Sequence, residues 1–172
     1  SKSYCKISGK NSTFILLCGV LAYGILIRLI RINKDVGVLT YCDENIYTNE
    51  IQHLIANDYS VPKTHLAGDL NYYPVVFILK LLGHLGLDLS GDNLIFYSRI
   101  LGPFSLSLLT AFILVKICKE LSTNKLAWKI TLLIYLISPY AASQSQFVYP
   151  DSYSIFFGSL CTLVFLQYLK NK

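Results

Sequence analysis

Long apolar blocks alternate with mixed polar segments along this chain of 172 residues. Each block is longer than the apolar stretch that a helix in a soluble core requires, and its length suits a helix that crosses a bilayer. The blocks lie at about residues 14–32, 100–117, 126–142 and 152–169. The pattern predicts an all-α integral membrane protein with about four transmembrane helices.

The long segment between the first two blocks, residues 33–93, has a different pattern. Apolar residues recur at helical spacing from Ile46 to Ile55, opposite polar positions, which is typical of a helix lying along a membrane surface. Residues 73–87 are apolar, but they number only about 15 against the roughly 20 that a spanning helix needs. We therefore expect an extracytoplasmic loop that carries in-plane juxtamembrane helices.

The charge distribution fixes the expected topology. With four spans, the lysine-rich segments 2–10, 116–129 and 170–172 all fall on one side, which the positive-inside rule makes cytoplasmic. If residues 73–87 also crossed, the lysines of 116–129 would lie outside, against that rule. The other membrane face then receives several charged residues from different helices: Asp43, Glu44, Arg99 and Asp151. Such convergence at a bilayer surface indicates a candidate site.

Composition narrows the class further. Apolar residues make up 53% of the chain and charged residues 15%, which excludes an ordinary soluble domain. The five cysteines are scattered without a CxxC motif and indicate neither a disulfide framework nor a zinc site. Nothing in the charge pattern points to a nucleic-acid partner. Because methionine is absent and the chain stops after an apolar block, we expect an N-terminal portion of a larger protein.

The acidic pair Asp43–Glu44 is the main candidate for chemistry. A carboxylate at the boundary of water and membrane has raised basicity and can accept a proton from a hydroxyl group. The structural alternative is that Asp43 caps the next helix, alone or in a capping box with Thr40. Arg99 could similarly be an interfacial anchor, and Asp151 after Pro150 a helix start. The tyrosines around Tyr73 fit an aromatic belt.

Four features follow one another in a fixed order: Cys42-Asp43-Glu44, Tyr72-Tyr73-Pro74, Ser98-Arg99, and the stretch from Ser138-Pro139 to Tyr149-Pro150-Asp151. This order resembles the N-terminal half of membrane glycosyltransferases of the GT-C type, above all protein O-mannosyltransferases and aminoarabinose transferases. The resemblance covers essentially residues 1–172. Many members of that family have His-Pro-Pro before the in-plane helix, where this chain has Asn71-Tyr72-Tyr73-Pro74.

The resemblance implies transfer of a sugar from a polyprenyl- or dolichyl-phosphate donor to an acceptor hydroxyl on a protein, lipid or glycan. It implies inversion at the anomeric carbon, with Asp43 as general base and Glu44 positioning the base or the acceptor. Arg99 would stabilise the leaving phosphate, ahead of Arg28 or Arg31. Asp151 would orient the acceptor or help to hold a divalent metal ion, and Tyr73 is a further candidate for substrate contact.

The implied location is the endoplasmic reticulum membrane or a prokaryotic plasma membrane, with the site facing the lumen, periplasm or exterior. Two other classes of function stay open at this point. One is a transporter segment in which the in-plane helix is re-entrant and intramembrane charges line a path. The other is a non-catalytic scaffold subunit whose acidic residues serve only as helix caps.

Overall fold

The computed structural model describes residues 9–30, 32, 44–57, 72–124, 126–148 and 150–172. These residues form helices, with no strand among them, so the all-helical prediction is confirmed for the described chain. In chain order the helices are α1 (Gly9–Ile30), α2 (Glu44–Ala56), α3 (Tyr73–His84), α4 (Gly91–Arg99), the π-helical segment η2 (Ile100–Phe104), α5 (Ser105–Leu121), α6 (Ala127–Ile137), α7 (Pro139–Gln144) and α8 (Pro150–Lys170).

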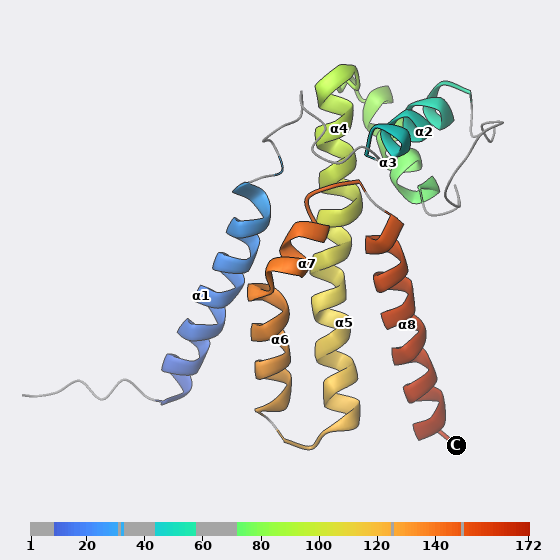
Figure 1. The fold of residues 1–172 in the computed structure, drawn as a ribbon. Coiled ribbons are helices and arrows are strands. Elements are labelled where there is room, and N and C mark those ends of the chain that lie inside the picture. The colour runs from blue at the N-terminus through green and yellow to red at the C-terminus, as the bar shows by residue number, and fades with distance from the viewer. Residues whose placement is uncertain (1–8, 31, 33–43, 58–71, 125, 149) are drawn as a thin grey trace, which may run out of the picture.

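Helices α1, α5, α6 and α8 run alongside one another, and α2, α3 and α4 gather at one end of this bundle (Figure 1). Helix α5 packs against both α6 and α8, and α6 packs against α1. Ala111, Leu132 and Leu136 form a buried core between these helices. Many other apolar side chains of the bundle are exposed, as expected where lipid replaces water as the solvent.

A second apolar core lies at the end where α2, α3 and α4 gather. It contains the buried residues Tyr47, Ile51, Leu54, Tyr72, Val75, Val76, Leu79, Leu94, Val148 and Tyr153. The rings of Tyr72 and Tyr153 meet edge to face, with their centroids 5.4 Å apart. This core holds α2 and α3 against the beginning of α8.

Within the part of the chain that the structure describes, two helices are long and apolar enough to cross a membrane. They are Gly91–Leu121, which comprises α4, η2 and α5, and Asp151–Lys170 within α8. The apolar helices Leu17–Ile30, Tyr73–His84 and Ala127–Ile137 are shorter. The count of four spans, with Tyr73–His84 lying in the membrane plane, therefore stays a prediction.

A proline explains the π-helical segment in the long helix. Pro103 has no N–H group, so it cannot bond to the carbonyl of Arg99 four residues earlier. The wider π turn from Ile100 to Phe104 accommodates this interruption without ending the helix. Arg99 is thereby the last residue of α4, directly before the change in helical geometry.

The expected apolar span at residues 126–142 is divided in the structure. Helix α6 ends at Ile137, and α7 begins at Pro139 after Ser138 takes a non-helical conformation. The Ser138 hydroxyl caps α7 by accepting a hydrogen bond from the Ala141 amide at 3.3 Å. Proline at the first position of a helix is favourable because its missing N–H would have no partner there.

Candidate functional site

The candidate site is built around a buried ion pair between Glu44 and Arg99. Glu44 is the first residue of α2, and Arg99 is the last residue of α4. Arg99 donates from Nε to Glu44 Oε1 and from Nη2 to Oε2, both at 2.8 Å. Both side chains are fully buried. This bidentate arrangement is the strongest geometry available to an arginine and a carboxylate.

Two further chain segments contact the pair. The Val148 amide donates a hydrogen bond to Glu44 Oε1 at 3.0 Å, and Arg99 Nη1 donates to the Ile32 carbonyl at 2.9 Å. The Arg99 guanidinium also lies over the ring of Phe147, 5.3 Å from its centroid. The pair therefore joins four parts of the chain: Ile32 two residues beyond α1, the start of α2, the end of α4 and the connection between α7 and α8.

The burial of this pair has an energetic consequence. Moving two charges out of water is costly, and their attraction offsets this cost only when the geometry is good and the remaining polar atoms are bonded. Here the Val148 amide and the Ile32 carbonyl supply such additional bonds. The pair thus holds the start of α2 in one position.

The structure places the predicted site residues as follows. Asp43 lies outside the described residues. Tyr73 begins α3 and is half-buried, and Asp151 is exposed in the first turn of α8. Of the predicted set, Glu44 and Arg99 are brought into direct contact. The predicted roles of Asp43, Tyr73 and Asp151 stay predictions.

Sequence reasoning selected Glu44 and Arg99 separately and missed that they pair. It also missed Phe147 and Val148, which contact the pair from the connection before α8. An apolar chain in which one acid and one arginine lie at predicted helix ends does carry a signal for pairing, because neither charge is stable alone in such surroundings. Nothing in the sequence marks the contributions of the Val148 amide and the Ile32 carbonyl.

Arg28 lies in the bundle, separate from the Glu44–Arg99 pair. Its guanidinium donates to the carbonyls of Gly24, Tyr135 and Leu136 and to the Ser107 hydroxyl, at 2.9 to 3.3 Å. Tyr135 and Leu136 belong to the last turn of α6, whose carbonyls lose their helical partners where the helix stops before Pro139. Arg28 thus caps the C-terminus of α6, where the helix dipole favours a positive charge.

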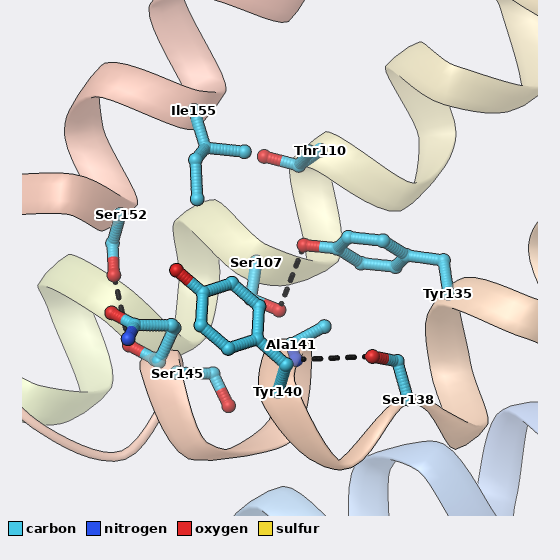
Figure 2. Close-up of a pocket in the computed structure, with 10 residues that line it drawn as sticks. Ser107, Thr110, Tyr135, Ser138, Tyr140, Ala141, Ser145, Ser152 and Ile155 are labelled. Atoms are coloured by element: carbon cyan, nitrogen blue, oxygen red, sulfur yellow. Dashed lines mark hydrogen bonds between the residues drawn. The ribbon is translucent and has the colours of Figure 1, made fainter.

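A cavity of about 240 Å³ lies between α5, α6, α7 and α8 (Figure 2). Many of its lining residues carry hydroxyl groups, but several of these groups are already bonded within the protein. Ser107 pairs with Tyr135 at 3.2 Å, Thr110 donates to the Leu106 carbonyl, and Ser152 donates to the Gln144 carbonyl. The cavity therefore offers few unused donors to a polar ligand.

The described residues contain no group of three or more histidine, cysteine, aspartate or glutamate side chains that could hold a metal ion. The Glu44 carboxylate is paired with the Arg99 guanidinium. Asp43 lies outside the described residues, so the divalent ion implied by the family resemblance stays a prediction.

Comparison with known families gives a match over the second half of the chain. Residues 88–172 match the family model of dolichyl-phosphate-mannose-protein mannosyltransferases. The predicted resemblance to protein O-mannosyltransferases, which are membrane glycosyltransferases, is therefore confirmed over this part of the chain. The matched residues include Arg99 and Asp151, whereas Asp43, Glu44 and Tyr73 precede them. Comparisons with curated proteins and with solved structures gave no match.

Proposed function

We propose that this chain forms part of a glycosyltransferase that moves mannose from dolichyl-phosphate mannose to a hydroxyl group of a protein. The family match supports this choice of donor and acceptor. The main observation that supports the location of the site is the Glu44–Arg99 pair. Because Asp43 is bonded to Glu44, consecutive Cα atoms being about 3.8 Å apart, fixing Glu44 restricts where Asp43 can lie.

In the proposed reaction Asp43 is the general base. The acceptor oxygen attacks the anomeric carbon from the face opposite the phosphate and loses its proton to the Asp43 carboxylate. The bond between the anomeric carbon and the phosphate oxygen breaks, and dolichyl phosphate leaves with the electron pair. This sequence inverts the configuration at the anomeric carbon. A positioned base contributes a factor of about 10² to 10⁴ to the rate of such a step.

In this proposal Glu44 and Arg99 are positioning residues that restrict where Asp43 can lie. Their charges compensate each other, and both side chains are fully buried. This geometry favours an indirect role for Arg99, through Glu44, over direct contact with the leaving phosphate. Asp151 is exposed and follows the segment that bonds to Glu44, so its carboxylate is available to an acceptor or to sugar hydroxyl groups.

We place this site at the extracytoplasmic face of a multi-pass membrane protein. Lysines gather at the other end of the bundle, where Lys170 pairs with Glu120 at 2.7 Å and Lys119 lies over the ring of Trp128. The positive-inside rule makes that end cytoplasmic. The Glu44–Arg99 end, with α2, α3 and α4, then faces the lumen or exterior (Figure 1).

The test is mannose transfer by the full-length protein in membranes, from labelled dolichyl-phosphate mannose to an acceptor peptide. Asp43→Asn should lower kcat by at least a hundredfold at unchanged expression. Asp92→Asn, which changes an exposed carboxylate in the first turn of α4, is the matched control and should keep wild-type turnover. Wild-type turnover in Asp43→Asn would refute the assignment of the base. A scaffold role would instead leave cell function intact in this variant.

A further inference from the structure

Three lysines and one tryptophan lie near the loop that joins α5 to α6, at the end of the bundle opposite α2, α3 and α4 (Figure 1). Lys116 and Lys119 belong to the last two turns of α5, and Trp128 and Lys129 to the first turn of α6. The Lys119 Nζ atom lies over the indole ring, 4.8 Å from its centroid, and the Lys129 Nζ atom lies 5.8 Å from the same centroid. Both distances are within the range of cation–π attraction. The Trp128 indole thus holds two ammonium groups close together.

These ammonium groups have no acidic partner among the residues that the structure describes. The sequence of α5, α6 and the loop between them contains a single acid, Glu120, and its carboxylate pairs with Lys170 of α8 at 2.7 Å. Lys116 and Lys119 are exposed, and Lys129 is half-buried. Because like charges held beside one another repel, an anion bound between them would be stabilised by both.

An exposed apolar stripe leads from these lysines along α5 toward the middle of the bundle. Leu109, Phe112, Lys116 and Lys119 follow one another at spacings of three or four residues, so they lie on one face of the helix. The side chains of Leu109 and Phe112 are 49% and 59% exposed. This face of α5 therefore presents hydrocarbon along its middle and positive charge at its end.

The arrangement matches the parts of an anionic phospholipid. The charged headgroup of such a lipid lies at the membrane surface, and its acyl chains extend into the hydrocarbon region. Anionic phospholipids give the cytoplasmic leaflet its negative surface potential, and lysines near that surface are attracted to them. A soluble anion would match the lysines, but it would make no use of the exposed hydrocarbon that continues from them.

We propose that the lysines around Trp128 bind the headgroup of an anionic phospholipid in the cytoplasmic leaflet, with one acyl chain along Phe112 and Leu109. The indole keeps Lys119 and Lys129 directed at one headgroup. This binding site lies away from the candidate site for sugar transfer. It requires the topology in which this end of the bundle is cytoplasmic, and it depends on neither the donor nor the acceptor of the proposed reaction.

The experiment measures binding of dioleoylphosphatidylserine to the full-length protein in detergent micelles by native mass spectrometry. Lys119→Gln combined with Lys129→Gln should raise the Kd by at least about tenfold, since each lysine near an anionic lipid contributes about a factor of five. Lys170→Gln combined with Lys172→Gln is the matched control, because it removes the same number of lysines from the same end of the bundle. This control should leave the Kd nearly unchanged. An equal rise in both double variants would reduce the effect to general charge attraction and overturn the proposal.

A conservative pair of substitutions and two competing molecules sharpen the test. Lys119→Arg combined with Lys129→Arg keeps both charges and their contact with the indole, so it should bind with the wild-type Kd. Phosphatidylcholine and glycerophosphoserine, which lack the net charge and the acyl chains respectively, should compete poorly. Competition by glycerophosphoserine as strong as that by phosphatidylserine would assign the surface to a soluble anion and refute the lipid site.

Photolabelling of the unsubstituted protein tests the position of the acyl chain. A phosphatidylserine with a photoreactive group in that chain should label the α5 peptide that contains Leu109 and Phe112. Unlabelled phosphatidylserine should suppress this labelling, and phosphatidylcholine at the same concentration should not. Equal suppression by the two lipids would mean that the face takes bulk lipid, against the proposal. The labelling requires neither a substitution nor turnover, so it decides the matter independently of variant stability and of mannose transfer.

Discussion

Tyr153 of α8 lies so close to Gly102 of η2 that a methyl group on Gly102 would be 2.5 Å from the Tyr153 hydroxyl oxygen. Gly102 is itself buried and directly precedes Pro103. The close contact brings the start of α8 against the π turn that follows Arg99. Both partners of this contact thus adjoin the candidate site, Gly102 through Arg99 and Tyr153 through Asp151.

We predict that Gly102→Ala destabilises the protein by about 1–3 kcal/mol, the usual cost of overpacking a buried site. The added methyl group would overlap the hydroxyl oxygen, whereas the Tyr153 ring carbon Cζ would lie at an ordinary 3.5 Å. Tyr153→Phe in the same protein should therefore restore most of the lost stability. Thermal unfolding in detergent measures both effects. If the double variant is no more stable than Gly102→Ala alone, this contact is not the cause of the loss.

We predict that Glu44→Gln destabilises the protein by about 3–5 kcal/mol, because it leaves the buried Arg99 charge without its partner. Arg99→Gln should have a similar effect, since it leaves the Glu44 carboxylate unpaired. Combining both substitutions should cost less than the sum of the two, and the difference measures the coupling between the residues. Additive losses of unfolding free energy would show that the pair does not interact. Asp92→Asn again serves as the control.

The sequence predicts much of this fold because the apolar pattern reflects helices directly. The helical character, the in-plane candidate at Tyr73–His84 and the long helices that include residues 100–117 and 152–169 all follow from periodicity and length. The prediction of one continuous span over residues 126–142 missed the break at Ser138. The structure at this break depends on Arg28, which is distant in sequence and bonds to the carbonyls that the break leaves. Contacts of this kind cannot be derived from local patterns.

The candidate site, too, could be predicted from the sequence only in part. Glu44 and Arg99 stand out in an apolar chain because charges near a membrane are rare and costly. Their pairing depends on how α2 and α4 pack, and on a backbone amide at Val148 that has no distinctive sequence. An apolar groove between α3, the long helix and α8 likewise depends on helices that meet only in the folded protein. Long-range packing decides both features.

We predict that Arg28→Lys destabilises the bundle although it keeps the charge. The guanidinium bonds to Leu136 at 2.9 Å, to Gly24 at 3.0 Å and to Ser107 at 3.1 Å, and a lysine ammonium cannot reproduce this planar geometry. Each lost charged hydrogen bond costs about 1.5–3 kcal/mol, so the melting temperature should fall clearly. Lys119→Arg, at an exposed position of α5, is the control and should not change it. An unchanged melting temperature in Arg28→Lys would show that capping of α6 by Arg28 contributes little.

A pair of glycines in α1 gives a prediction with a control in the same helix. A methyl group on Gly24 would lie 3.0 Å from both Cβ and Cδ2 of Leu136, whereas one on Gly19 would meet nothing within 4 Å. Small residues allow close approach of membrane helices, so Gly24→Ala should push α1 away from α6 and cost about 1–3 kcal/mol. Gly19→Ala should be neutral or slightly stabilising, because alanine favours the helix.

Unfolding of the two variants in a mixed-detergent titration distinguishes them. Since Cβ of Leu136 is fixed to the backbone of α6, rotation of the side chain relieves only the contact with Cδ2. Leu136→Ala in the Gly24→Ala protein should therefore give a combined loss smaller than the sum of the single losses, but should not restore wild-type stability. Equal stability of Gly19→Ala and Gly24→Ala would mean that α1 and α6 are not held at this distance in the membrane.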